Sequence, residues 1–279
     1  MNTILTVRAS NGEEDLLAGL VGTLAQRYRL VGFGQPADVA WLDGSAPAWP
    51  ALVDEAVSGG VRAVIVHRPA AVDPANLVQL AAAPIPVVLL GRATHAPAGR
   101  ALLERGVLPA KRVDLVSLVT GVEAAGGERS AVLDLLLTLG VYGLAPDRLD
   151  SVAATPRGVI VEGPLGEGRI HATAVHMIGA CANTRMAVLL PGRHIELAAG
   201  PSTTAAPGWA CVTSADGQDS PPTDYEPPGR LALQDVWHSV VHRRPPPSGL
   251  HGHRRAFSLA YDAPLLTQNP TPIRAWAGS

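Results

Sequence analysis

Two pairs of histidine and arginine are the residues of this chain best suited to acid–base chemistry and anion binding. His67 and Arg68 end the clearest apolar run, and Arg92 and His95 follow the next apolar run, which ends at Leu90. Continuous apolar runs of this length are typical of strands that are buried on both faces. If the strands are parallel, their carboxyl ends share one edge of a sheet, where open α/β sheets bind ligands. We therefore expect both pairs to line one crevice.

Arg92 and His95 are the candidate catalytic residues of that crevice. An arginine keeps its proton near neutral pH, so Arg92 suits the binding of an anionic group and is a poor general acid. His95 can titrate near neutral pH and could donate a proton. The alternative for His95 is an ordinary histidine of a loop or surface.

A turn rich in acidic residues follows the first predicted strand, TILTVRA. The turn contains Ser10, Asn11 and Gly12, and three acidic residues at 13–15 follow at once. A dinucleotide site here needs the pattern GxGxxG, because glycines let the backbone approach a pyrophosphate at the helix N-terminus. One glycine is present instead, and close like charges shielded from water repel by up to several kcal/mol. This turn therefore disfavours ordinary NAD(P) binding, unless the true turn lies one strand away.

The first hundred or so residues alternate between strand and helix patterns with short connections, which predicts a parallel, doubly wound sheet of the Rossmann-like kind. We expect strands over 3–9, 28–33, 38–42, 61–67 and 86–90. We expect helices after the first turn, ending near Arg27, and over 48–58, 73–83 and 97–106.

Beyond residue 110 the pattern changes to mostly strands. Polar and apolar residues alternate over 169–177, which predicts a sheet with one covered face. We expect a strand over 113–119, a helix over 130–139, strands from about 150, a mobile loop over 214–230, and helices over 231–242 and 251–261. The prediction is a Rossmann-like domain over 1–110, followed by an α+β domain over 111–279 with an open mixed or antiparallel sheet.

Composition excludes several classes of protein. The formal net charge is −2 and no basic stretch exceeds a few residues, so nucleic-acid binding is not expected. No apolar run approaches the roughly 20 residues of a membrane span, and the N-terminus does not resemble a signal peptide. The cysteines and histidines show no zinc-binding spacing. We expect a cytoplasmic protein with no metal site and no membrane partner.

Four stretches of the chain resemble the Gfo/Idh/MocA oxidoreductase family. They are VRAVIVHRP, PIPVVLLGRATHAP, ERSAVLDLLLTLG and MAVLLPGRHIELAAGP. The resemblance covers nearly the whole chain, and the string YRLVGF is similar to the thiazolinyl imine reductases of the same superfamily. It implies a Rossmann domain followed by an α+β domain, NADP as cofactor, and reduction of an imine or ketone in a biosynthetic pathway.

The resemblance also assigns roles to individual positions. The family uses a lysine to supply the proton that accompanies hydride transfer, and Arg92 occupies the matching tract. Ser130 and Asp134 occupy the region where the family has an inward-facing acid and histidine, so they are the candidate substrate-binding residues. The candidate cofactor-binding residues are Ser10, Asn11, Gly12, His67, Arg68 and Pro69.

Three functions remain open. The first is a divergent NADP-dependent reductase acting on a small molecule. The second is a binding or scaffold subunit without a cofactor, which grips a partner enzyme or a carrier-bound or peptide intermediate. The third is a cofactor-free cyclase or isomerase in which His67, Arg68, Arg92 and His95 are the acid–base groups. A homo-oligomer is expected, because the family commonly uses its open sheet for subunit contacts.

Overall fold

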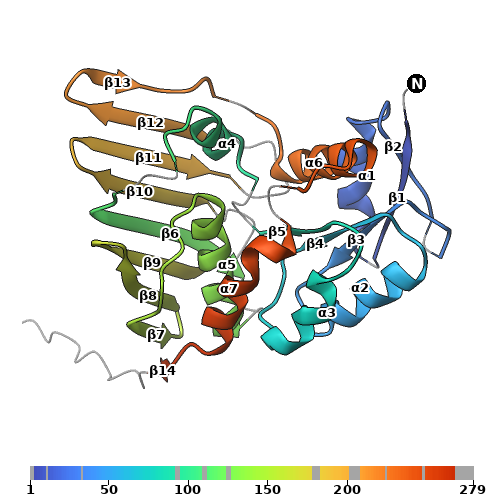
Figure 1. The fold of residues 1–279 in the computed structure, drawn as a ribbon, viewed down its shortest axis with the longest axis horizontal. Coiled ribbons are helices and arrows are strands. Elements are labelled where there is room, and N and C mark those ends of the chain that lie inside the picture. The colour runs from blue at the N-terminus through green and yellow to red at the C-terminus, as the bar shows by residue number, and fades with distance from the viewer. Residues whose placement is uncertain are drawn as a thin grey trace, which may run out of the picture.

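Two β-sheets form the framework of the protein, and each lies in its own half of the molecule (Figure 1). The computed structural model describes residues 3–10, 12–32, 34–91, 95–108, 112–123, 127–177, 183–200, 208–223, 225–246 and 249–267.

The first sheet has five parallel strands in the order β2-β1-β3-β4-β5. They are β1 (Leu5–Ala9), β2 (Tyr28–Leu30), β3 (Val39–Asp43), β4 (Ala63–His67) and β5 (Val87–Leu90). Every residue of β4 and β5 is buried, as expected of strands covered on both faces. Because β1 lies between β2 and β3, the winding reverses at β1. The predicted doubly wound, Rossmann-like sheet is confirmed.

Helices cover both faces of this sheet. On one face, α1 (Glu14–Gly22) shares a hydrophobic cluster with alternate residues of the strands, among them Val39 and Trp41 of β3. On the other face, α2 (Trp49–Ser58) and α3 (Leu77–Ala81) pack against the intervening residues, among them Ala40. A 3-10 turn, η1 (Pro74–Asn76), leads into α3. Strand side chains therefore alternate between two separate cores.

The second sheet has nine strands in the order β13-β12-β11-β10-β6-β9-β8-β7-β14. They are β6 (Leu115–Glu123), β7 (Ser151–Thr155), β8 (Gly158–Leu165), β9 (Gly168–Met177), β10 (Thr184–Leu190), β11 (Arg193–Ala199), β12 (Trp209–Ser214), β13 (Gly217–Asp219) and β14 (Leu265–Thr267). The pairs β6–β9 and β7–β14 are parallel, and the remaining pairs are antiparallel. The predicted open mixed sheet is confirmed.

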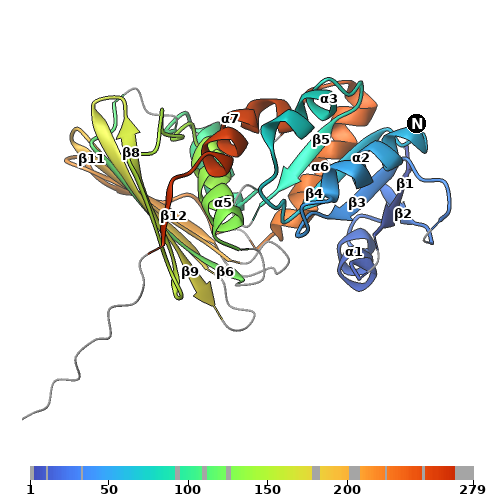
Figure 2. The ribbon, with the colours of Figure 1, turned by 90° about the horizontal axis from the view of Figure 1, so that it is seen from below.

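Described helices cover only one face of the second sheet. They are α4 (Pro97–Glu104), α5 (Gly127–Val141) and α7 (Leu250–Tyr261). Figure 2 shows α5 and α7 on the same side of the sheet, between it and the first half of the molecule. On β9, Ile170, Ala172 and Ala174 are buried and the residues between them are more exposed. This alternation confirms the prediction of a sheet with one covered face.

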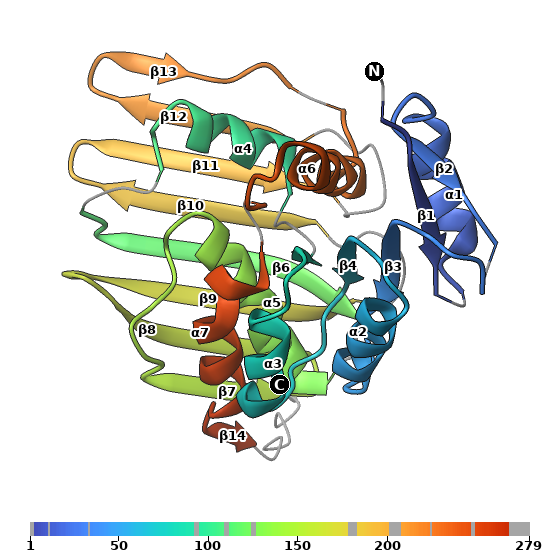
Figure 3. The same cartoon turned by 45° about the vertical axis from the view of Figure 1, so that its right-hand side comes forward.

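A helix from the end of the chain completes the first half of the molecule. α6 (Pro228–His242) lies beside α1 and packs on β4 and β5 (Figure 3). Its buried residues Leu233 and Val236 belong to the same hydrophobic cluster as β1 and α1. The Tyr28 hydroxyl donates a 2.6 Å hydrogen bond to the Leu233 carbonyl, and the Trp237 indole donates to the Thr3 carbonyl at 2.9 Å.

Part of the segment predicted as a mobile loop is a β-hairpin. β12 and β13 pair across a turn at Ala215 and Asp216, and α6 begins at Pro228, three residues before the predicted start at 231. The following Gly217 has a φ of 126°, which is accessible to glycine and strained for other residues. The dipeptide Asp216-Gly217 is a known hairpin signal, and the surrounding prolines and acids obscured it.

No described helix is long and apolar enough to cross a membrane.

Replacing Tyr28 by Phe tests how strongly α6 is held to the first sheet. Tyr28→Phe removes the buried hydrogen bond to Leu233 and is expected to lower the free energy of unfolding by about 1–2 kcal/mol in urea titrations. Tyr261→Phe is the matched control, because no hydrogen bond joins the Tyr261 hydroxyl to any described residue. Equal losses in the two variants would contradict the assignment.

Candidate functional site

The carboxyl ends of β1, β3 and β4 meet at the edge of the first sheet where the strand order reverses. Open α/β sheets bind ligands at this switch point. Ser10 follows β1, Asp43 ends β3, and His67 and Arg68 end and follow β4. The Asp43 amide donates to the Ser10 hydroxyl at 2.9 Å, and the Ser10 amide donates to the Trp41 carbonyl at 2.8 Å. The predicted crevice therefore brings Ser10, His67 and Arg68 together.

The carboxylate of Glu13 lies at the centre of this edge. Glu13 directly precedes α1 and is 5% exposed. Its Oε2 accepts hydrogen bonds from the Trp41 indole at 3.0 Å and from Nδ1 of His67 at 2.9 Å. Its Oε1 accepts from the Arg68 guanidinium at 2.9 Å. Three side chains from β3, β4 and the loop after β4 therefore converge on one acid at a helix N-terminus.

The Glu13 carboxyl is held in its charged form. Burial alone would raise its pKa, but the hydrogen bond and charge of His67, the hydrogen bond of Trp41 and the charge of Arg68 outweigh burial and lower the pKa. A carboxylate only accepts hydrogen bonds, so the proton of the 2.9 Å contact belongs to Nδ1 of His67. The tautomer of His67 is thus set by Glu13. The N-terminus of α1 adds a favourable partial positive charge.

Arg68 reaches Glu13 from a strained backbone conformation. Its φ is 54°, a left-handed value that costs a residue other than glycine about 1 kcal/mol or more. The Arg68 amide donates to the Leu90 carbonyl at 3.0 Å, and its guanidinium also lies 3.4 Å from Oδ1 of Asp43. The neighbouring Gly44 is required, because a Cβ there would lie 2.9 Å from Cα of Pro69. Close packing of two loops holds Arg68 in place.

Two of the backbone amides at this turn already have acceptors within the protein. The Gly12 amide donates to the Glu14 carboxylate at 2.8 Å, and the Glu13 amide donates to the Ser10 carbonyl at 3.2 Å. In a dinucleotide site these groups would approach the pyrophosphate. Here a pyrophosphate would meet the buried Glu13 carboxylate and the neighbouring Glu14. The residues present at this turn do not fit an NADP pyrophosphate.

His95 lies in a different cluster, between the two halves of the molecule. It is 6% exposed, and its Nε2 lies 3.7 Å from Oδ2 of Asp235 on α6. Arg100 of α4 binds the other Asp235 oxygen at 3.2 Å. Burial, with the charges of Arg100 and His253, lowers the pKa of His95 to about 3. His95 is therefore a neutral imidazole near pH 7, which argues against the predicted role as a proton donor.

The remaining predicted site residues lie in several places. Ser130 of α5 accepts a 3.2 Å hydrogen bond from the Ala71 amide in the loop after β4, so it joins α5 to the first half of the molecule. Asp134 lies one turn further along α5 and is partly buried. Asn11 and Arg92 lie outside the described residues. The structure thus gives Ser130 a structural contact, and its role toward a substrate stays a prediction.

Sequence reasoning missed three members of the switch-point cluster: Glu13, Trp41 and Asp43. Glu13 was recognised only as a negative charge that would repel a phosphate. The signal that could have identified it is the pair His67-Arg68 at the end of a buried strand, because buried hydrogen-bond donors need an acceptor such as an acid. Trp41 lies within an apolar run, where a tryptophan is usually read as core.

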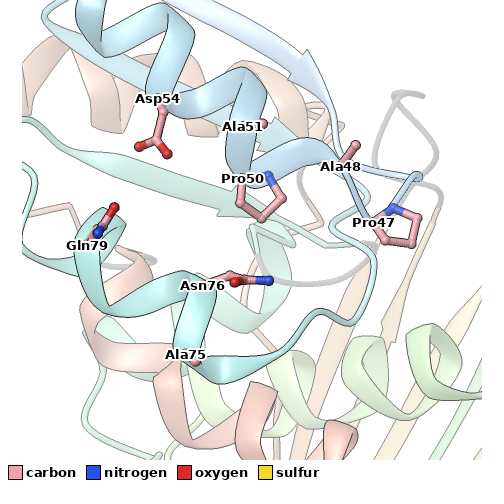
Figure 4. Close-up of a pocket in the computed structure, with 8 residues that line it drawn as sticks. All are labelled: Pro47, Ala48, Pro50, Ala51, Asp54, Ala75, Asn76 and Gln79. Atoms are coloured by element: carbon pink, nitrogen blue, oxygen red, sulfur yellow. The ribbon is translucent and has the colours of Figure 1, made fainter.

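A separate depression of about 430 Å³ lies between α2 and α3 (Figure 4). The side chains of Asp54, Asn76 and Gln79 face it, and Pro47 and Pro50 line its other end. All three polar side chains are exposed, and none of them contacts the switch-point cluster. This depression is a feature of the surface apart from the candidate site. Within the described ranges, no group of three metal-binding side chains is close enough to hold a metal ion.

Replacing Glu13 by Gln is expected to lower the free energy of unfolding at pH 7 by about 2 kcal/mol, because it removes the charged acceptor of the Arg68 guanidinium and of Nδ1 of His67. The folded-state pKa of Glu13 is lowered, so its contribution is complete above the ordinary glutamate pKa of about 4.3 and is lost as pH falls through the folded-state value. The wild type and the variant should therefore converge in acid. Urea unfolding across pH measures this.

Glu55→Gln is the matched control for that experiment. Glu55 is exposed on α2, and its carboxylate has no ion pair within the described part of the chain. Its loss should change stability by less than about 0.5 kcal/mol at every pH. A Glu13→Gln difference that does not depend on pH would show that the carboxylate charge has no part in the network.

Comparison of the sequence with protein-family models and with curated protein sequences found no match. Comparison with solved structures found several similar folds. UDP-N-acetylglucosamine 3-dehydrogenase GnnA from Acidithiobacillus ferrooxidans has a TM-score of 0.72 and 10% identity, covering 93% of this chain and 96% of that one.

Two further structures show the same likeness. A 3-ketoreductase from Actinomadura kijaniata, solved with NADP and TDP-benzene, has a TM-score of 0.67 and 12% identity, covering 94% of this chain and 97% of that one. A dehydrogenase from Clostridium difficile has a TM-score of 0.68 and 9% identity, covering 92% of this chain and 97% of that one. The chain therefore has the two-domain fold of the Gfo/Idh/MocA-type oxidoreductases, as its sequence predicted.

Proposed function

We propose that this protein is a non-catalytic binding subunit that keeps the oxidoreductase fold and uses no dinucleotide. Its role is to hold a partner enzyme, or an intermediate carried on a protein or peptide. The observation that carries the proposal is the buried Glu13 carboxylate at the N-terminus of α1, bound by Trp41, His67 and Arg68. This carboxylate places a negative charge at the helix N-terminus, where the negative charge of a bound pyrophosphate would lie.

The strength of the network supports this reading. A bound pyrophosphate would have to displace Glu13 from its three hydrogen-bond donors and leave its carboxylate buried beside another anion. Loss of these charge-assisted hydrogen bonds costs about 2 kcal/mol, which is a factor of about 30 in affinity. Removal of Glu14 alone would not open the turn, because Glu13 holds Arg68 independently.

NADPH and NADH are expected not to bind the wild type at millimolar concentration in calorimetric titrations. Glu13→Ala, which frees Arg68 and the start of α1, should bind either nucleotide more tightly than the wild type does. Glu55→Ala serves as the control and should behave like the wild type. Saturable NADPH binding by the wild type would overturn the proposal, and so would equal absence of binding in Glu13→Ala and Glu55→Ala.

A divergent NADP-dependent reductase of an imine or ketone is the second candidate. The observation that favours it is the likeness of almost the whole chain to a 3-ketoreductase solved with NADP. That likeness concerns the fold, and function resides in the site. The same titration separates the two candidates, because a reductase must bind the nucleotide before it can transfer a hydride.

A cofactor-free cyclase or isomerase is the third candidate. The Glu13–His67 contact favours it, since a carboxylate that orients an imidazole is a common arrangement in general base catalysis. His67 is only 2% exposed, however, and a general base must reach its substrate. Turnover that His67→Gln abolishes while the fold persists would favour this candidate over the binding subunit.

The uncovered face of the second sheet supports a role in assembly. Its exposed apolar residues are Leu115 and Val119 of β6, Ile160 of β8, Leu189 of β10 and Trp209 of β12. Leu115 pairs with Leu189 on the neighbouring strand, and Val119 pairs with Arg185, so apolar side chains on this face stand beside a charged one. Apolar groups gathered on one face mark interaction surfaces. We assign this face to a second copy of the chain, which gives a two-fold dimer.

Val119→Glu is expected to dissociate that dimer, because it places a carboxylate in the middle of the face. Sedimentation velocity should show a dimer for the wild type and a monomer for the variant. Val78→Glu is the control: Val78 is an exposed valine of α3 in the other half of the molecule. A monomeric wild type, or a variant that stays dimeric, would contradict the assignment.

A further inference from the structure

Two adjoining depressions of about 540 and 320 Å³ lie at the amino ends of β4 and β5, at the edge of the first sheet opposite to the switch point, and together they are called the groove. Ile85, Pro86, Pro245 and Pro246 line both, so apolar side chains lie where the two depressions meet. The groove shares no residue with the switch-point cluster, so an inference about it is independent of the function proposed above.

Three arginines line the larger end of the groove: Arg62, Arg243 and Arg244. Arg62 forms an ion pair with Asp38 at 3.5 Å. For Arg243 and Arg244, the described residues supply neither an ion pair nor a side-chain hydrogen bond, whereas Arg68, Arg100 and Arg105 each have an acidic partner. This end of the groove therefore carries positive charge that the described residues leave uncompensated.

Arg243 adopts a left-handed backbone conformation, which arginine does not favour. It follows α6 with a φ of 55°, a left-handed conformation in which glycine is the usual residue at the end of a helix. The negative C-terminal end of α6 attracts a cation, but a lysine or arginine within the last helical turn would satisfy it without strain. Strained positions of this kind cluster at functional sites.

The shape and chemistry of the groove indicate which ligand it takes. A single phosphate or carboxylate would occupy only the end with the arginines and leave the proline floor unused. Prolines and Ile85 suit the apolar side chains of an extended chain, which contacts such surfaces at low entropic cost. We infer that the groove binds an extended segment of a partner protein, with acidic residues at Arg243 and Arg244 and apolar residues along Pro245 and Pro246.

The test uses a fluorescein-labelled peptide of sequence Glu-Glu-Glu-Pro-Leu-Pro-Leu-Pro and fluorescence anisotropy with the full-length protein. The wild type should bind it, and affinity should fall with rising salt, as expected of exposed charges. R243S/R244S should weaken binding about tenfold. The same peptide with Gln in place of Glu should bind as weakly to the wild type as the acidic peptide binds to R243S/R244S.

R157S/R193S is the matched control. Arg157 lies in the turn between β7 and β8, and Arg193 is the first residue of β11; both are exposed and form no ion pair with any described residue. This variant makes the same change in net charge and should bind the acidic peptide within about twofold of the wild type. Ile85→Ser should weaken binding without changing its dependence on salt, because it alters only the apolar floor.

Arg243→Gly separates binding from stability. Glycine relieves the left-handed strain, so this variant should have a higher Tm than the wild type and yet bind the peptide more weakly. No binding by the wild type, equal weakening in R243S/R244S and R157S/R193S, or equal binding of the Gln peptide would overturn the inference. A dimer that R243S/R244S dissociates would assign the groove to a second copy of the chain and would also overturn it.

Discussion

The first half of the molecule depends on one negative charge at the N-terminus of α1. Arg68, His67 and the Trp41 indole all donate to the same place, and the helix itself presents a positive end there. Buried donors without an acceptor would be costly, so this position must hold an anion. In a dinucleotide-binding protein the anion is the pyrophosphate of the bound cofactor. Here it is the side chain of Glu13, which Arg68 reaches from a strained turn beside the close loop contact at Gly44.

Local pattern was enough to predict the first sheet. β4 and β5 are continuous apolar runs bounded by glycine or proline, and buried parallel strands require that pattern. The alternation along β9 likewise predicted a sheet with one open face. The pattern of polar and apolar residues could not predict which polar groups are partners, because Glu13 and His67 are 54 residues apart in the chain. His95 shows the same limit: only its burial beside Asp235 reveals that it is neutral at pH 7.

Three surfaces of the molecule now have distinct physical characters. At the switch point three donors bind the Glu13 carboxylate, the open face of the second sheet carries exposed apolar side chains, and the groove at Arg243 has positive charge that the described residues leave uncompensated. The first has little to offer a ligand, while the other two have contacts still to make. A binding subunit, as proposed above, would use the second and third of these surfaces.

The position of α6 has a consequence for how the protein is made. The Tyr28 hydroxyl binds a carbonyl 205 residues later, and α6 closes the hydrophobic cluster that begins with β1. A ribosome adds about 5–20 residues per second, so the first sheet waits about 10–40 seconds for its last helix. During that interval the apolar face of β4 and β5 is open, while the second sheet is being synthesised beside it. A first half made without α6 would therefore keep this apolar face uncovered.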